Sequence, residues 1–398
     1  MTQAAEAEAL ILAHMPRFPA RQEPLAACVG RVLAEDVQSE RDQPPFDRVT
    51  MDGIAIAYRD LAAGVRSYEV VGTQAAGAEP LAIAAAQCVE VMTGTALPHG
   101  ADTVVPVERV QRSGANAAIA ADAPVAAEQF VHRRGSDRAQ GSLVLRAGAR
   151  LGPPEIAVLA GAGRAAALVA ELPRVAVIST GDELVEAGKP IAAHQIRSTN
   201  DRAVEASLTQ HRLGNVVRAR LRDDANALAV AIDRLDTELD VLVLSGGVSM
   251  GKFDFVPSVL TELGAKLVLH KVEQQPGRPM WFGVSARGKP IFALPGNPVS
   301  TLVCATRYLL PALRHASGFA PAPQELVETT MPIEGSPTLT LFTPVTLSSS
   351  DRGVLLAAPH RPNTSGDFFT LAGTAGFIEL PAKRGSYAPG TVARLFRW

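Results

Sequence analysis

The sequence has few cysteines, no long apolar run and almost no net charge, and each absence excludes a class of protein. Cys28, Cys88 and Cys304 are an odd number without metal-ligand spacing, so we expect buried thiols rather than a disulfide framework. No apolar run reaches the roughly 18 residues that a membrane helix needs. Lys and Arg total 38 against 40 Asp and Glu, a formal charge of −2, which argues against a general nucleic-acid binder. Glu6 and Glu8 stand where a signal peptide would be basic, so a cytoplasmic protein is expected.

The chain also lacks internal repeats, low-complexity linkers and a nucleophile elbow, and none of its 8 histidines falls in a metal-ligand spacing. Hydrophobic residues make up 47% and charged residues 20%, as in chains that bury true cores. A length of 398 residues suggests roughly two to four domains.

The pattern along the chain changes from β-rich to alternating α/β and back. A helix is predicted over 4–15, a compact β-rich region over 46–143, and a further helix starting at Pro153. From 173 to 315, strands are predicted at 175–179, 216–221, 241–245, 267–272 and 291–294, and helices near 200–211, 225–236, 255–263 and 298–314. This alternation predicts a doubly wound parallel sheet with ligands at the carboxyl ends of its strands. From residue 326 onward the sequence again has a strand-and-turn pattern, which predicts a small β-barrel.

One glycine motif has two interpretations. Gly161-Ala162-Gly163-Arg164-Ala165-Ala166 fits the dinucleotide fingerprint, which requires a strand before the glycines and a helix after them. Because a helix is predicted to start at Pro153, before the glycines, a helix ending in a glycine cap is favoured.

Carboxylates follow two predicted strands of the α/β region. Asp182 and Glu183 come after the first of these strands, and Asp223 and Asp224 follow the next. These acids would lie at the ligand-binding edge of the sheet. The alternatives are a solvated acidic loop for the first pair and helix capping for the second.

Glycine-rich and proline-rich turns follow the other strands. Gly246, Gly247 and Ser249 lie in a loop whose backbone N–H groups could cradle an oxyanion, with Asp254 placed to hold a metal beside it. The alternative is a plain tight turn. The segment 294–301 repeats the arrangement, and 274–279 is a rigid turn that carries a guanidinium. Several carboxylates, two anion loops and a basic turn together fit phosphate-ester chemistry assisted by Mg²⁺.

Eight motifs in order resemble the molybdopterin molybdenumtransferase family, which comprises the MoeA proteins and the E domain of gephyrin. They are "TMDGIAIA", "VMTGTALPHGADTVVPVE", "STGDELVEAGKP", "QIRSTNDRAV", "LRDD", "LSGGVSMGKFD", "PGRPMWFG" and "LPGNPVST". The resemblance covers nearly the whole chain. It implies an α/β multidomain fold with an extended linker domain (1–45 and 144–172), an inserted β-rich domain (46–143), an α/β molybdopterin-binding domain (173–322) and a C-terminal β-barrel (323–398).

The resemblance also implies an activity: insertion of molybdate into adenylylated molybdopterin with release of AMP, dependent on Mg²⁺ or a similar divalent cation. The catalytic acids would be Asp52, Glu183, Asp223 and Asp254, of which the last three would hold the metal. The substrate-binding residues would be Thr93, Gly246, Gly247, Ser249, Pro276, Gly277, Arg278, Pro295, Gly296, Asn297 and Ser300. The family forms homodimers with a shared active site, and the implied protein partners are the molybdopterin adenylyltransferase and apo-molybdoenzymes; neither nucleic acid nor a membrane is expected.

The sequence departs from the family pattern mainly in the basic turn, where Gln275 replaces a usual lysine and Arg278 replaces a second one. Ile54, Ser136 and the Val49-Thr50 lead-in are further departures. Two alternatives remain. An adenylyltransferase shares the α/β domain but lacks the flanking β regions. A non-catalytic scaffold could lose acids such as Asp52 or Asp254 without consequence, and this chain has both.

Overall fold

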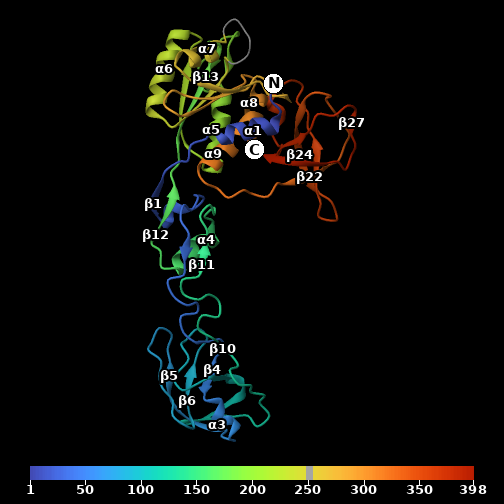
Figure 1. Ribbon diagram of the computed structural model, residues 1–398. Coiled ribbons are helices and arrows are strands. Elements are labelled where there is room, and N and C mark those ends of the chain that lie inside the picture. Colours follow the sequence, from blue (N-terminus) through green and yellow to red (C-terminus); the bar gives the residue numbers. More distant parts are fainter. Residues whose placement is uncertain (248–253) are drawn as a thin grey trace. The chain divides into compact units, whose positions relative to one another are not determined.

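The computed structural model describes residues 1–247 and 254–398, and it divides into two compact units (Figure 1). The larger unit comprises Met1–Glu35, Ala147–Gly152 and Ala166–Trp398. The smaller unit comprises Asp36–Arg146 and Pro153–Ala165. Each unit therefore contains more than one chain segment.

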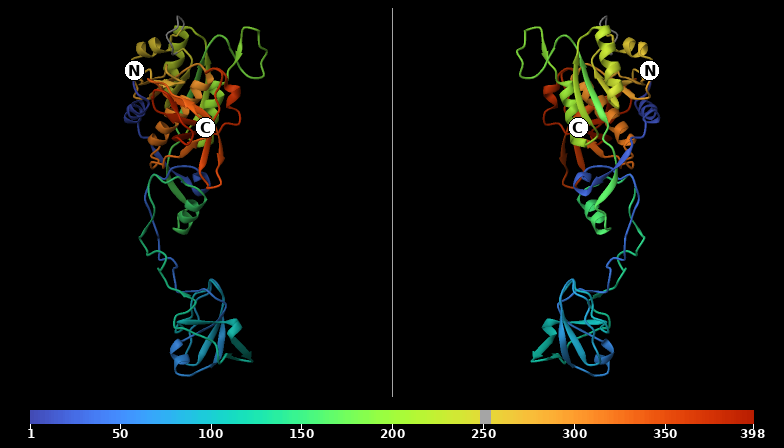
Figure 2. Two further views of the ribbon diagram at one scale, coloured as in Figure 1. Left: turned by 90° about the vertical axis from the view of Figure 1, so that its right-hand side faces the viewer. Right: turned by 90° about the vertical axis from the view of Figure 1, so that its left-hand side faces the viewer.

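The centre of the larger unit is a six-stranded sheet covered by helices on both faces (Figures 1 and 2). Its strands lie in the order β16 (Asn215–Leu221), β13 (Arg174–Thr180), β17 (Val241–Ser245), β21 (Pro290–Leu294), β20 (Trp281–Val284) and β18 (Lys266–His270). The first four of these strands are parallel. All five predicted aliphatic runs form strands of this sheet.

The sheet is mixed rather than wholly parallel, which corrects the prediction. β20 runs antiparallel to both β21 and β18. Only a short turn separates β20 from β21, and in it the Ser285 N–H donates to the Lys289 carbonyl at 2.8 Å. A parallel connection needs a crossover of a dozen or more residues, so a turn this short imposes the antiparallel arrangement.

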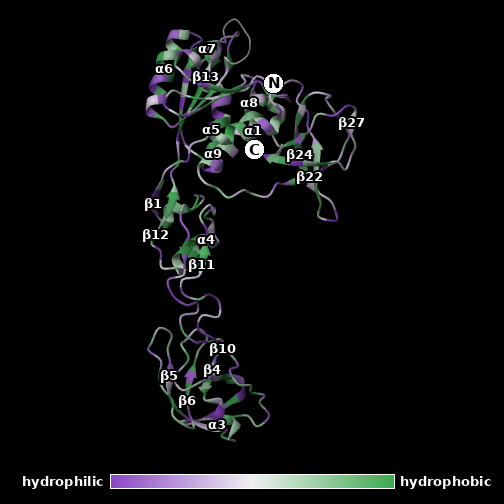
Figure 3. Ribbon diagram, in the orientation of Figure 1, coloured by the Kyte–Doolittle hydropathy of each residue, from purple (hydrophilic) through white to green (hydrophobic). Residues whose placement is uncertain are grey.

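Two hydrophobic cores lie on opposite faces of the sheet. Val175 and Val177 of β13 pack into one core, whereas Ala176 and Ile178 pack into the other, as the two-residue period of a strand requires. Because both faces are covered, β13 and β17 each contain an unbroken aliphatic run, 175–178 and 241–244 (Figure 3). The first core is covered by α1 (Ala4–Ala13), α5 (Asn200–His211), α8 (Pro298–Cys304) and α9 (Leu310–Ala316), and the second by α6 (Ala225–Glu238) and α7 (Val256–Glu262). A π-helical segment, Ala305–Leu309, joins α8 to α9.

The C-terminal region is the predicted β-barrel. Five strands close on themselves in the order β24 (Thr340–Ser349), β25 (Leu355–Pro359), β22 (Leu326–Thr329), β28 (Val392–Arg397) and β26 (Gly376–Leu380), with β26 pairing back to β24. Val327, Val345 and Ile378 fill its core. The short strand β19 (Gln274–Gln275) pairs with β24 and so joins the basic turn of the α/β region to the barrel wall.

The remaining elements of the larger unit are short. They are β1 (Ala20–Pro24) paired with β12 (Ala166–Ala170), β14 (Leu184–Val185) paired with β15 (Ile196–Arg197), β23 (Ile333–Glu334) paired with β27 (Ser386–Tyr387), α2 (Leu25–Cys28) and the 3₁₀ turn Phe368–Leu371. The segment between β14 and β15 projects from the α/β region as a loop (Figure 2).

The smaller unit is β-rich, as predicted. Its main sheet has the order β7 (Thr103–Pro106), β4 (Gly53–Ile56), β6 (Gln87–Val91), β5 (Ser67–Gln74), β9 (Asn116–Ile119) and β8 (Val110–Ser113). Ile54, Tyr68 and Val105 lie in its core. The other elements are β3 (Arg48–Val49) paired with β10 (Val131–His132), β2 (Val37–Gln38) paired with β11 (Leu143–Leu145), α3 (Tyr58–Ala62), the 3₁₀ turn Val107–Arg109 and α4 (Pro153–Gly161).

The structure decides the interpretation of the glycine motif at 161–166. Helix α4 precedes the glycines and strand β12 follows them, the reverse of the order that a dinucleotide fingerprint needs. Gly163 has φ +77° at the end of α4, as expected for a helix cap. All three cysteines are buried and free. Within the described ranges, no helix has the length and apolar character needed to cross a membrane.

Candidate functional site

The acidic loops gather at one edge of the central sheet, as predicted. β16, β13 and β17 are parallel neighbours, so the turns after Leu221, Thr180 and Ser245 all leave the same edge. The pKa of the half-buried Asp223 carboxyl is raised, mainly by burial and then by the negative charges of Glu183, Asp182 and Asp254. Glu183, Asp182 and Asp254 therefore all lie within electrostatic reach of Asp223. We call this set (Asp182, Glu183, Asp223 and Asp254) the acidic edge.

The two aspartates after β16 have different roles. Asp224 is the N-cap of α6, and its Oδ1 accepts a hydrogen bond from the Ala227 N–H at 2.8 Å. Helix capping is therefore the correct interpretation for Asp224. Asp223 belongs instead to the acidic edge.

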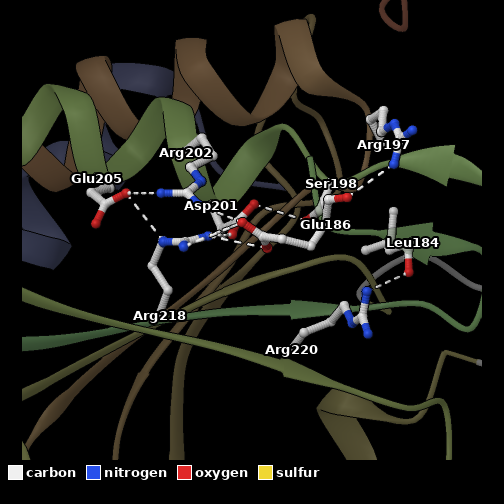
Figure 4. Close-up of polar contacts among 9 residues, drawn as sticks. All are labelled: Leu184, Glu186, Arg197, Ser198, Asp201, Arg202, Glu205, Arg218 and Arg220. Carbon is white, nitrogen blue, oxygen red and sulfur yellow. Dashed lines mark hydrogen bonds and ion pairs between the residues drawn. The ribbon is translucent and has the colours of Figure 1, made fainter. Parts of the chain in front are cut away.

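Arginines fix the backbone directly after the acidic turn (Figure 4). Arg220 donates to the Leu184 carbonyl at 2.8 Å, and Arg197 donates to the Glu186 carbonyl at 2.9 Å. The Glu186 carboxylate in turn pairs with Arg218 at 3.4 Å. Several charged contacts thus hold a segment that would otherwise be an exposed loop, and they restrict where the preceding acids can lie.

Gly246 and Gly247 make a close turn against the end of β13. Gly246 and Gly247 have φ values of +98° and +65°, and a Cβ on Gly246 would lie 2.8 Å from the Thr180 carbonyl oxygen. A side chain could not be accommodated at Gly246 without moving the end of β13. Ser249, which was predicted to bind substrate, lies outside the described residues.

The segment that follows β21 is held from two sides. Asn200 Nδ2 donates to the Gly296 carbonyl at 2.7 Å and also to Ser245 Oγ at 2.7 Å. Asn297 Nδ2 donates to Ser365 Oγ at 2.7 Å, which ties this segment to the barrel region. Its position is therefore set by both the α/β region and the barrel region of the larger unit.

A cavity of about 940 Å³ lies between these parts of the larger unit. It brings together many of the predicted substrate-binding residues, namely Gly247, Pro276, Gly277, Arg278, Pro295, Gly296, Asn297 and Ser300, together with Asp254. Glu183, Asp223 and Gly246 are not among its lining residues. Asp254 is therefore the residue that belongs both to the cavity and to the acidic edge.

The barrel side of the cavity was missed by the sequence analysis. Its polar lining residues are Glu334, Ser336, Thr343, Arg361, Asn363, Thr364 and Ser365. The sequence feature that could have indicated this side is the run Arg361-Pro362-Asn363-Thr364-Ser365. It places a cation, an amide and two hydroxyl groups together within a β-rich region. Arg361 is a second cation of the cavity beside Arg278.

Asp52 and Thr93 form a small polar turn in the smaller unit. Asp52 Oδ1 accepts from the Thr93 N–H at 2.7 Å and from Thr93 Oγ1 at 2.8 Å. These hydrogen bonds, the backbone one most of all, lower the pKa of the Asp52 carboxyl, so it is ionised at neutral pH. The turn thus presents a fixed carboxylate on a unit separate from the one that carries the cavity.

Comparison with known proteins identifies the family. The chain is 37% identical to the molybdopterin molybdenumtransferase of Synechocystis over the full length of both chains. The chain belongs to the molybdopterin molybdenumtransferase family. It is also 30% identical to the molybdopterin molybdenumtransferase of Bacillus subtilis, over 92% of this chain and 86% of that one.

Family regions and solved structures agree with this assignment. Residues 2–163 match the MoeA N-terminal region (domain I and II), residues 176–315 the probable molybdopterin binding domain, and residues 327–396 the MoeA C-terminal region (domain IV). A molybdopterin biosynthesis MoeA protein from Pyrococcus horikoshii superposes with a TM-score of 0.85 at 30% identity, covering 100% of this chain and 99% of that one. The α/β multidomain fold with a C-terminal β-barrel, predicted from the family resemblance, is therefore confirmed, and the domain bounds stay a prediction.

Proposed function

We propose that this chain inserts molybdate into adenylylated molybdopterin with release of AMP, within molybdenum cofactor biosynthesis in the cytoplasm. The observation that carries the proposal is the junction at Asp254, where the acidic edge meets a cavity that also contains Arg278 and Arg361. Carboxylates suit a divalent cation, and guanidinium groups suit an oxyanion. A site with both kinds of group could bind an oxyanion beside a phosphoanhydride whose cleavage is assisted by a divalent cation.

The acidic edge fits Mg²⁺ or a similar divalent cation. Asp223 is half-buried, and its charge is disfavoured first by burial and then by the neighbouring carboxylates of Glu183, Asp182 and Asp254. A hard cation prefers such oxygen ligands. We propose that Glu183, Asp223 and Asp254 hold this cation, which when bound would polarise the phosphoanhydride and stabilise the departing phosphate. Within residues 1–247 and 254–398, no group of three or more His, Cys, Asp or Glu side chains is already placed to hold a metal ion. Binding of the cation would therefore draw these carboxylates together.

The cavity residues would place the two anionic reactants. Molybdate and the dithiolene repel each other in water, so the protein must neutralise charge before sulfur can replace oxygen. Arg278 and Arg361 would provide positive potential for molybdate, and the backbone at Pro276, Gly277 and Ser300 would face it. The glycine loop at Gly246 and Gly247 would allow the phosphate of the pterin to approach the backbone closely.

A direct assay tests the proposal. Purified protein is mixed with adenylylated molybdopterin, Mg²⁺ and molybdate, and AMP is followed over time. We expect release of AMP that requires both molybdate and Mg²⁺. Production of adenylylated molybdopterin from ATP and molybdopterin would support the adenylyltransferase alternative instead, and absence of either reaction would support the scaffold.

We further propose a homodimer whose active site is shared, because Asp52 and Thr93 lie on a unit separate from the cavity. Mixing an inactive Asp52→Asn protein with an inactive Asp254→Asn protein should then restore activity, because one of the two sites in a mixed dimer carries neither change. The expected recovery is about a quarter of wild-type AMP release, since about half the dimers are mixed and each has one intact site. Subunit exchange is verified with differently tagged chains. Confirmed exchange without recovery would mean that Asp52 serves the site of its own chain or none at all.

The molybdopterin adenylyltransferase and apo-molybdoenzymes remain the proposed protein partners. The first must supply an adenylylated substrate and the second must receive a finished cofactor. No role for nucleic acid or a membrane is proposed.

A further inference from the structure

The turn 275–278 rests on a buried hydrogen-bond network of three side chains from separate elements. Gln274 on β19, Cys304 at the end of α8 and Tyr308 in the π-helical segment are all almost fully buried. The Tyr308 hydroxyl donates to Gln274 Oε1. Because the amide oxygen is engaged by the tyrosine, the amide nitrogen of Gln274 must face the turn.

The network holds two successive carbonyl groups of the turn. Gln274 Nε2 donates to the Pro276 carbonyl at 3.1 Å and to Cys304 Sγ at 3.4 Å. Cys304 Sγ donates to the Gly277 carbonyl at 3.5 Å. Both carbonyls therefore point into the protein, toward the network.

Burial keeps the network in its neutral, donating form. It raises the pKa of the Cys304 thiol to about 12, and it raises the pKa of the Tyr308 hydroxyl as well. The tyrosine can therefore donate to Gln274, and the thiol to Gly277, throughout the physiological pH range.

The opposite side of the same peptide groups faces the cavity. In a trans peptide the N–H points away from the C=O, so the N–H groups of Gly277 and Arg278 point away from the network. Neither N–H donates to any acceptor among the described residues, and both residues line the cavity. Successive N–H groups that point the same way form an anion-binding concavity. Arg278 also brings a positive charge to the cavity lining: its guanidinium pairs with no carboxylate in the described ranges and donates only to Met1 Sδ there, from Nε at 3.3 Å and from Nη2 at 3.0 Å.

Close packing makes this arrangement sensitive to the network. Gly277 has φ +95°, and a Cβ there would lie 2.5 Å from Cys304 Sγ and 2.7 Å from Gln274 Nε2. The turn is therefore seated directly on the side chains that orient it. A change of one hydrogen bond in the network would change the direction of the two N–H groups.

We infer that Gln274, Cys304 and Tyr308 are positioning residues that aim the Gly277 and Arg278 N–H groups at the oxyanion substrate. This inference rests on the proposed function, because it assumes that molybdate binds at the turn. Cys304 and Tyr308 are not among the residues that line the cavity, whereas Gln274 is, so the variants at Cys304 and Tyr308 are the decisive ones. All three side chains act through the carbonyl groups of the turn. Their loss is thus expected to alter molybdate binding far more than binding of the pterin or the rate of the chemical step.

The test is calorimetric titration of the full-length protein with sodium molybdate, combined with steady-state AMP release. Tyr308→Phe removes one hydroxyl and keeps the ring. We expect it to weaken molybdate binding and raise the KM for molybdate by about fivefold, the effect of losing one ordinary hydrogen bond, with kcat and the KM for adenylylated molybdopterin little changed. Gln274→Met, which keeps the length and removes both polar atoms, should have a larger effect in the same direction. Arg278→Gln serves as the positive control for molybdate binding.

One control and one further variant separate positioning from general stability. Tyr68→Phe removes another buried hydroxyl, one that donates to the Val65 carbonyl at 3.1 Å in the smaller unit, and should leave molybdate affinity unchanged. Cys304→Ala is a second network variant in case Gln274→Met does not fold. Folded Tyr308→Phe and Cys304→Ala proteins that bind molybdate as wild type does would overturn the inference.

The outcomes also distinguish the inference from the proposed function. If wild-type protein takes up molybdate and the network variants do so more weakly, but no AMP is released from adenylylated molybdopterin, the inference stands and the proposed reaction fails. If wild-type protein takes up no molybdate, the turn is not an oxyanion site and the inference fails with it.

Discussion

Glu183→Gln and Asp254→Asn are each expected to lower the rate of AMP release at least about a hundredfold, equivalent to about 2.7 kcal/mol of transition-state stabilisation. Each substitution replaces a carboxylate of the acidic edge by an amide of nearly the same shape. A charged oxygen ligand is lost, so the cation that stabilises the departing phosphate is held less well. The measurement is single-turnover AMP release over a range of Mg²⁺ concentrations. If the metal role is correct, high Mg²⁺ should partly restore the rate.

The chain offers a matched control for this experiment in two adjacent aspartates. Asp223→Asn removes a member of the acidic edge and should reduce AMP release as the other two changes do. Asp224→Asn changes the N-cap of α6, where asparagine caps about as well as aspartate, and should leave activity near that of wild type. Equal activity of the two variants would remove Asp223 from the mechanism.

Stability measurements show whether lost activity reflects lost folding. The pKa of Asp223 is raised in the folded protein, so its charged form is disfavoured there. The ionised carboxylate therefore lowers the stability of the folded protein once the pH rises above the range in which an unfolded aspartate ionises. Without added metal, Asp223→Asn should therefore unfold at a higher temperature than wild type at pH 7. The difference should vanish at about pH 3, where the carboxyl is protonated in both states. Thermal unfolding at the two pH values checks this sign.

The strands of the central sheet could be predicted from the sequence where a strand is buried on both faces and is therefore aliphatic. β13, β17 and β21 are buried along nearly their whole length, and an unbroken aliphatic run marks each of them. β20 was missed because Trp281-Phe282-Gly283-Val284 is short and contains a glycine, and its partner is set by the turn that follows. Strand direction depends on that connection, which a search for alternating helices and strands does not examine.

Only the part of the site that lies at the ends of neighbouring parallel strands could be predicted from the sequence. Parallel neighbouring strands bring their carboxyl ends together, so the meeting of Glu183 with Asp223 could be predicted from the alternation of elements. Arg361 and Ser365 could not, because they reach the cavity through the pairing of β19 with β24 and through the bond between Asn297 and Ser365. Contacts between residues so far apart in the chain leave no local pattern in the sequence.

Arg307→Met is expected to be the most destabilising of the changes considered, because it breaks an ion-pair cluster in the interior of the larger unit. The Arg307 side chain is fully buried and lies 2.7 Å from Glu8 Oε2 and 3.1 Å from Glu379 Oε2. Its guanidinium also lies 4.9 Å from the centre of the Phe396 ring, a cation–π contact. One side chain of the π-helical segment thus joins α1 to the barrel.

The expected loss follows from the charges that the substitution leaves behind. The side chains of Glu8 and Glu379 are only 24% and 15% exposed, so both carboxylates would be left largely desolvated without their main partner. Removing one partner of a buried ion pair typically costs about 3–5 kcal/mol of folding free energy. We expect a loss of about 3 kcal/mol, measured as the free energy of unfolding of the larger unit in urea. Adding Glu8→Gln and Glu379→Gln should recover part of this loss, because no unpaired charge then remains.

Arg397→Met provides the comparison on the surface of the same barrel. Arg397 pairs with Glu325 at 2.6 Å, but the two side chains are 50% and 41% exposed. Exposed ion pairs contribute about 0–1 kcal/mol, because water solvates either charge when its partner is removed. The Arg307 change should therefore cost several times more than the Arg397 change, and high salt should reduce only the smaller cost. Equal losses for the two arginines would show that the buried cluster contributes no more to stability than a surface pair, and that packing of α1 and the barrel against the central sheet holds the larger unit together without it.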